Sequence, residues 1–159
     1  MVNLMDRKSL RIYVENSVIS AYYYASGWML TATKQFFNKA IEENHELFTS
    51  DVTILELDSA REDIRENILK IIQEYRIKVV SITDAARRLA EEYVARGMIP
   101  GKYRADAEHI AVASVEGFDA LASWNLRHIV KLKTRSMVRL INREIGYSVP
   151  EIIRPDEVL

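Results

Sequence analysis

The sequence has no cysteine among its 159 residues, which excludes disulfide bonds and thiolate metal sites. Any metal site must therefore use carboxylates, amides, hydroxyls or the three histidines. No apolar run approaches the ~20 residues that a membrane-spanning helix needs, and the opening MVNLMDRKS is too polar for a signal peptide. These absences favour a cytoplasmic protein that has no membrane partner.

The sequence also lacks a linker rich in proline or glycine, a low-complexity segment and an internal repeat. At 159 residues it is long enough to bury the core of one domain. We therefore expect a flexible N-terminal segment over residues 1–9 and a single domain over residues 10–159.

Charge is close to balanced in total, with a net charge of −1, but it is unevenly distributed. Residues 120–143 contain no acid and six cations, whereas residues 42–74 contain ten acids and three bases. Such asymmetry indicates a polyanionic partner, although a run of charge is often only a solvated face.

Short apolar strands alternate with helical patterns along the chain. We predict strands over 10–14, 46–50, 77–82 and 118–123, with a last edge strand over 151–155. We predict helices over 31–44, 51–58, 62–75, 83–97, 101–117, 125–132 and 134–146. This alternation is typical of an α/β domain with a mostly parallel sheet of four to five strands.

A polar triplet interrupts the most strand-like segment, RIYVENSVISAYYY (11–24). One interpretation is that the strand simply ends and Asn16 or Ser17 caps a helix. The other is that Glu15 lies at the strand end because a cation must bind there. Ligands of such sheets bind outside the carboxyl ends of the strands, and this rule predicts Glu15 and Asn125 at one edge.

Other chemically distinctive side chains also occur at the ends of predicted elements. Glu56 lies in a short helix, and Asp106 and His109, spaced i and i+3, share one face of a buried helix. Carboxylates that converge repel one another unless a cation joins them, so the pattern predicts Mg²⁺ or Mn²⁺ with oxygen ligands. Taken singly, each residue also fits an ordinary structural role.

Four motifs follow one another in a specific order: E-N-S after the first strand, S-x-x-x-x-x-E-L (50–57), D-A-x-H-I-A-x-A (106–113) and D-x-L-x-S-W-N-x-x-H-I (119–129). Together they resemble the PIN domain, in particular the VapC-like toxin ribonucleases of type II toxin–antitoxin pairs. The resemblance implies a three-layer α/β/α sandwich that binds one or two Mg²⁺ or Mn²⁺ ions and cleaves single-stranded RNA.

The resemblance also implies a set of site residues: Glu15, Glu56 and Asp106 as metal ligands, Asn125 as a fourth catalytic residue, and Asn16, Ser17 and His109 behind them. The basic stretch supplies the residues expected to contact RNA: Arg127, Lys131, Arg135 and Arg139. Two residues depart from the family pattern. Glu15 replaces a shorter aspartate, and Asn125 stands where many members carry a fourth aspartate.

These departures leave two other hypotheses open. A degenerate PIN-like domain could bind RNA or a protein partner without catalysis. A metal-dependent phosphatase or a receiver-like domain would require an aspartate at the end of the first strand, where this chain has Glu15.

An aromatic segment, SAYYYASGWML (20–30), follows the polar triplet. We expect Tyr22, Tyr23, Tyr24 and Trp28 to be exposed there, which is unusual for a plain surface loop. PIN toxins commonly form homodimers, so the resemblance predicts a homodimer interface or an antitoxin-binding groove. Rings that only cap the core would explain the pattern equally well.

Overall fold

The computed structural model describes residues 9–157. The flexible segment expected over residues 1–9 therefore lies outside the described residues, apart from Ser9. The elements are, in chain order, β1 (Arg11–Val14), α1 (Asn16–Tyr24), α2 (Gly27–Glu42), β2 (Glu46–Ser50), α3 (Asp51–Asp58), α4 (Glu62–Glu74), β3 (Lys78–Val80), α5 (Asp84–Ala95), the 3₁₀ turn η2 (Gly101–Tyr103), α6 (Arg104–Val115), β4 (Ala120–Ala122), α7 (Leu132–Ile145) and β5 (Glu151–Ile153).

The five strands form one sheet in the order β3-β2-β1-β4-β5, and every neighbouring pair is parallel. In the centre of the sheet Ile12 is in register with Leu47 of β2 and with Ala120 of β4. The chain moves outward from β1 to β3 and then returns to the other side of β1. The predicted parallel sheet is confirmed, and its switch point lies between β1 and β4.

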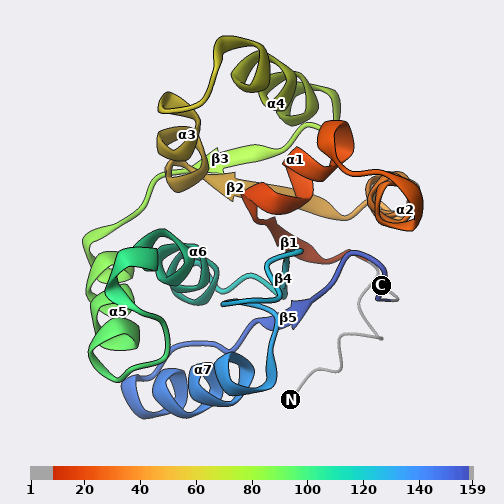
Figure 1. The fold of residues 1–159 in the computed structure, drawn as a ribbon. Helices are drawn as coiled ribbons and strands as arrows, with labels where there is room; N and C mark the ends of the chain where they lie inside the picture. The colour runs from red at the N-terminus through yellow and green to blue at the C-terminus, as the bar shows by residue number, and fades with distance from the viewer. Residues whose placement is uncertain (1–8, 158–159) are drawn as a thin grey trace.

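Helices cover both faces of this sheet (Figure 1). Alternate residues of a strand point to opposite faces, so Tyr13 and Leu121 pack with α5, α6 and α7. Their neighbours Ile12, Val14 and Ala122 pack with α1, α2 and α4 on the other face. The expected three-layer α/β/α sandwich is confirmed.

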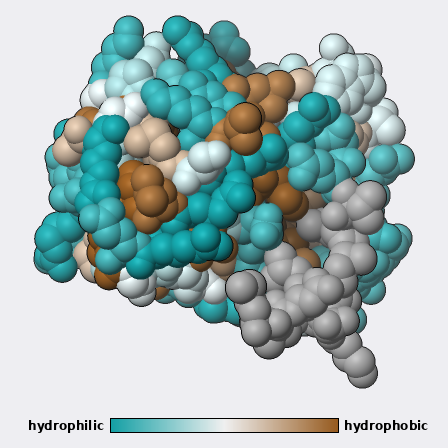
Figure 2. All heavy atoms as spheres, turned by 90° about the horizontal axis from the view of Figure 1, so that it is seen from below, coloured by the Kyte–Doolittle hydropathy of each residue, from teal (hydrophilic) through white to brown (hydrophobic). Residues whose placement is uncertain are grey.

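The surface seen from the side of α7 is mostly hydrophilic, with separate hydrophobic patches (Figure 2). Leu132 and Leu140 are exposed residues of α7. Among residues 9–157, no helix is both long and apolar enough to cross a membrane.

The helix predicted over residues 125–132 was wrong, because this segment is an irregular turn that ends where α7 begins at Leu132. The carbonyl oxygen of Asn125 accepts from the backbone N–H groups of both Ile129 (3.1 Å) and Val130 (2.8 Å). Its side-chain oxygen accepts from His128 N at 2.9 Å. An asparagine that satisfies nearby backbone donors with its own side chain competes with a continuing helix.

The polar triplet ends β1 and begins α1 at the same time. Glu15 itself is the N-cap of α1, since its side chain accepts from the backbone N–H of Ser17, so neither Asn16 nor Ser17 has that role. The helix predicted from residue 31 begins earlier, at Gly27. Gly27 has a φ of 61°, which lets the chain turn sharply between α1 and α2.

Candidate active site

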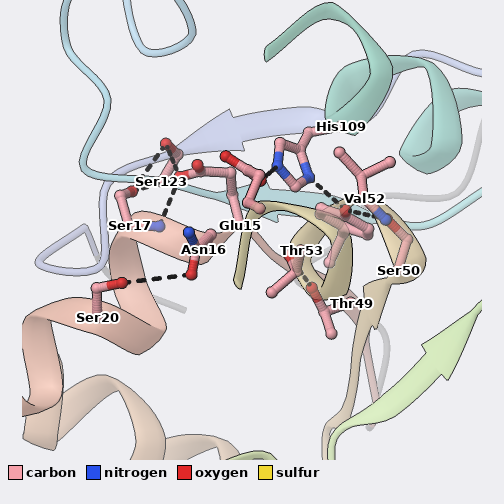
Figure 3. A network of polar contacts seen from close by, with 12 residues as sticks. Glu15, Asn16, Ser17, Ser20, Thr49, Ser50, Val52, Thr53, His109 and Ser123 are labelled. Carbon is pink, nitrogen blue, oxygen red and sulfur yellow. Dashed lines mark hydrogen bonds and ion pairs between the residues drawn. The ribbon is translucent and has the colours of Figure 1, made fainter. Parts of the chain in front are cut away.

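Acidic side chains from distant parts of the chain meet at the carboxyl edge of the sheet, beside the switch point. Glu15 directly follows β1, Glu56 belongs to α3 and Asp106 lies in the first turn of α6. The charges of Glu15 and Glu56 both act on Asp106, so the three carboxylates are near one another. Figure 3 shows the polar network around Glu15, with Ser17 and Ser123 on one side and His109 on the other.

Glu15 is buried, with 4% of its surface exposed, and its carboxylate is held by two serines. Its Oε2 accepts from the backbone N–H of Ser17 at 3.1 Å, from the hydroxyl of Ser123 at 2.8 Å and from the hydroxyl of Ser17. Ser17 Oγ in turn accepts from Trp124 N at 2.9 Å, which ties β1 to the segment after β4. All of the hydrogen bonds made to this carboxylate by residues 9–157 go to Oε2, so Oε1 is the oxygen open to a cation.

The electrostatics of the site are clearest at Asp106. Burial raises the pKa of this carboxyl from 3.8 to about 6, and the nearby charge of Glu15 adds to the effect. A hydrogen bond from Asn125 opposes the rise. Because Asn125 Oδ1 already accepts from His128 N, the amide nitrogen is the group that faces Asp106.

Glu56 is positioned by a chain of hydrogen bonds that leads into the core. Its Oε1 lies 2.6 Å from His109 Nε2, and His109 Nδ1 lies 2.5 Å from the hydroxyl of Tyr13. Tyr13 in turn contacts Ser50 Oγ at 2.8 Å. Ser50 also accepts from Val52 N and thereby caps α3, the helix that carries Glu56. This series of hydrogen bonds therefore fixes both helix α3 and the carboxylate of Glu56.

His109 is fully buried, and its surroundings favour the charged form. Burial alone would lower its pKa, but the hydroxyl of Tyr13, the hydrogen bond to Glu56 and the charge of Glu15 outweigh burial. The pKa of His109 is consequently raised well above its ordinary value of 6.5. The two ring nitrogens of His109 thus contact Glu56 on one side and the hydroxyl of Tyr13 on the other.

The donor set fits a hard divalent cation, although the ligands are not gathered into a closed cage. Within residues 9–157, no group of three or more acidic or histidine side chains has the spacing to hold a metal ion. Mg²⁺ commonly binds through one or two carboxylates and keeps several waters. Glu15 through Oε1, together with Asp106, matches that requirement, while Glu56 keeps one oxygen bound to His109.

The remaining predicted residues differ in how they relate to this edge. Asn16 accepts a hydrogen bond from Ser20 at 3.3 Å, so its side chain pairs along α1. Arg127 and Lys131 lie in the turn that follows Asn125. Arg135 faces the body of the protein.

Arg135 Nε donates to the carbonyl of Ile152 at 3.1 Å, and its guanidinium pairs with Glu157 at 3.3 Å. Arg139, one turn further along α7, is exposed. The two predicted RNA contacts of α7 are therefore not equivalent: only Arg139 presents a free side chain to solvent.

Three hydroxyl residues of the network were given no role from the sequence: Tyr13, and Ser50 and Ser123, which occur only as positions of the quoted motifs. Each lies within a strand or directly after one. The strands were predicted from the apolar residues beside these three. The available signal was the hydroxyl group itself, because a buried tyrosine or serine requires a hydrogen-bond partner.

The sequence matches no protein-family model and no curated protein. The structure is similar to a chain in the crystal structure of VapBC2 from Rickettsia felis bound to a DNA fragment from their promoter. The TM-score is 0.59 and the sequence identity 12%, over 91% of this chain and 98% of that chain. The chain has a PIN-like fold. At this level of identity the similarity establishes the PIN-like architecture, and the activity must be argued from the site.

Proposed function

We propose that this PIN-like chain is a divalent-metal-dependent ribonuclease that cleaves single-stranded RNA. The observation that carries the proposal is the convergence of Glu15, Glu56 and Asp106 at the switch point, where burial and negative charge raise the pKa of Asp106 to about 6. Carboxylates that lie near one another repel, and a cation bound between them removes that repulsion, so the arrangement favours the binding of a cation.

Glu15 and Asp106 would hold Mg²⁺ or Mn²⁺, with Glu56 beside them. Such an ion, when bound, lowers the pKa of a water molecule and neutralises charge on a phosphoryl group. The positive charge of such an ion would lower the pKa of Asp106 and favour its ionised form, opposing the effect of burial and of its acidic neighbours. Glu56 is held by His109 through Oε1 only, so its second carboxylate oxygen would be the group that accepts a proton from an attacking water.

Cleavage of labelled single-stranded RNA tests this proposal. We expect the wild-type protein to cut in Mg²⁺ or Mn²⁺ and to stop cutting in EDTA. Asp106→Asn should abolish cleavage and leave RNA binding intact, because it removes a ligand charge and no cation. Glu108→Gln, which changes an acid in the same helical turn, is the matched control and should cut normally. Equal cutting by all three proteins in EDTA would contradict the proposal.

One observation favours a second candidate, a PIN-like domain that binds RNA or a protein without cutting. Glu15 Oε2 is occupied by Ser17 and Ser123, and Glu56 Oε1 by His109, so the described carboxylates are not arranged as a closed metal cage. Wild-type protein that binds RNA and cuts in no divalent ion would establish this candidate.

We also propose that the chain is the toxin of a toxin–antitoxin pair and that it forms a homodimer. The structural neighbour comes from the VapBC2 complex, which supports an antitoxin as partner. Tyr24 of α1 is 51% exposed and Trp28 of α2 is 62% exposed, whereas Tyr22 packs partly against the core. Exposed aromatic rings on adjacent helices suit a protein interface.

A further inference from the structure

Cations gather on one side of the acidic edge, in a group that we call the basic cluster: Lys102, Tyr103, Arg127, His128 and Lys131. The rings of Tyr103 and His128 are in contact, with their centroids 4.2 Å apart and their planes tilted by 34°. Arg127 lies over the Tyr103 ring at 5.5 Å, and Lys102 Nζ lies 5.2 Å from the same ring. The ring pair is thus a platform that holds two cations by cation–π attraction.

The cations of this cluster have no acidic partner in direct contact among residues 9–157. Lys102, Arg127 and Lys131 form no ion pair with any residue in the described part of the chain. Burial, followed by the charges of these three residues, lowers the pKa of His128. His128 Nε2 is buried and has no hydrogen-bond partner among residues 9–157. Cations held together without an acid favour the binding of an anion.

Other nearby cations differ in this respect. Arg104 pairs with Glu91, and Lys133 donates to the carbonyl of Gly97 at 3.0 Å. These two side chains are engaged in the fold, whereas those of the basic cluster are available to a ligand.

The basic cluster adjoins the acidic edge in two ways, along the backbone of α6 and through the side chain of Asn125. Tyr103 precedes Asp106 by three residues, so roughly one helical turn separates them. Asn125 connects the two groups directly, because its side chain donates to Asp106 and accepts from His128 N. A chain molecule bound at the acids can therefore continue onto the cluster.

The opposite side of β1 offers no such surface. In the sheet order, β2 and its following helix α3 flank β1 on one side, while β4 and the cluster flank it on the other. Helix α3 contains three acids, Asp51, Glu56 and Asp58, and no cation. A polyanion that crosses the acidic edge is therefore attracted to one side only.

We propose that the basic cluster is a subsite for two neighbouring backbone phosphates of single-stranded RNA, adjacent to the bond that is cut. This inference rests on the proposed ribonuclease function and assigns the path that the strand takes away from the site. Since the ring pair is occupied by the contact between its two rings and by the two cations, the subsite binds phosphate and does not read a base.

RNA binding by fluorescence anisotropy tests the subsite, in EDTA so that metal binding does not contribute. The test variant is Lys102→Ala/Lys131→Ala, which leaves the Tyr103–His128 pair in place. Each phosphate contact in a single strand contributes a salt slope of about 0.7, so two lost contacts weaken binding about 25-fold at 0.1 M salt. The slope of log K against log salt should fall by about 1.4.

The matched control is Lys70→Ala/Arg88→Ala, which removes the same charge from exposed positions of α4 and α5. We expect the control to change the affinity for RNA by less than about threefold. The test variant should lose about 25-fold, which is about 1.4 on a base-10 logarithmic scale. Two RNAs of unrelated sequence should lose affinity equally. Mn²⁺ binding to the test variant, measured by calorimetry, should equal that of wild type.

Each contrary outcome has a distinct meaning. Equal losses in the test and control variants, or a loss for one RNA sequence only, would overturn the phosphate subsite while the ribonuclease proposal stands. If the test variant binds RNA as tightly as the wild type does, the phosphate subsite would also be overturned while the ribonuclease proposal stands. Wild-type protein that binds no single-stranded RNA would overturn both proposals.

Discussion

Replacing Asp106 by asparagine should stabilise the metal-free protein. The carboxyl has a pKa of about 6 in the folded chain, against 3.8 as its ordinary value. A difference of this size corresponds to about 3 kcal/mol for a fully buried group. Asp106 is only partly buried, so screening by solvent reduces the expected effect to about 1–2 kcal/mol in the free energy of unfolding. Asparagine is close in shape and carries no charge.

The sign of the pH dependence follows from the raised pKa. Below about pH 3 the carboxyl is protonated in both states, and wild type and variant should be about equally stable. As the pH rises from about 4 to about 6, the folded state holds the proton more tightly than the unfolded state, so wild-type stability falls relative to the variant. Above about pH 6.5 the difference should be constant.

Urea unfolding in EDTA at several pH values measures this difference, with Glu108→Gln as the control that should show no such gain. Saturating Mg²⁺ should reverse the order, because the ion binds the folded wild type and at 100 times its Kd stabilises it by about 2.7 kcal/mol. If Asp106→Asn destabilises the metal-free protein at pH 7.5, the carboxylate makes net favourable contacts and the charge-repulsion argument fails.

Three further predictions follow from single contacts. Tyr13→Phe removes the hydroxyl shared by Ser50 and His109, so it should lower the free energy of unfolding by about 1–3 kcal/mol and weaken Mn²⁺ binding in calorimetry; unchanged metal affinity would make the hydroxyl purely structural. Arg135→Gln removes the bond to the Ile152 carbonyl, so it should lower the Tm and leave the salt slope of RNA binding unaltered; a fall in that slope by about 0.7 would show that Arg135 contacts phosphate. Trp28→Ser should shift a dimer towards monomer in sedimentation at tens of micromolar without loss of thermal stability, and a dimer that persists would move the interface elsewhere.

The sequence was sufficient to predict the architecture because its signals are local. Apolar strands separated by helical patterns gave the parallel sheet, and polar residues directly after strands gave the edge where the acids meet. Glu15 illustrates both interpretations of the polar triplet: it is a helix cap and, in the same conformation, a member of the acidic site.

The details that could not be predicted depend on contacts between distant segments. Tyr13 looks like one more strand residue until α6 brings His109 against its hydroxyl. The turn after Asn125 has helical spacing, and only its local hydrogen bonds show that no helix forms. Arg135 resembles its neighbour Arg139 in the sequence, but within residues 9–157 only Arg135 donates a hydrogen bond to β5.

The pairing of β1 with β4 also governs when the site can exist. Glu15 depends on Ser123 and on the carbonyl of Ala122, which are translated more than a hundred residues later. Parallel pairing across such a separation is slow, since the intervening chain must be ordered before contact is made. Until β4 has been synthesised, Glu15 lacks both of these contacts. On the proposed function, catalytic competence requires the pairing of β4 with β1.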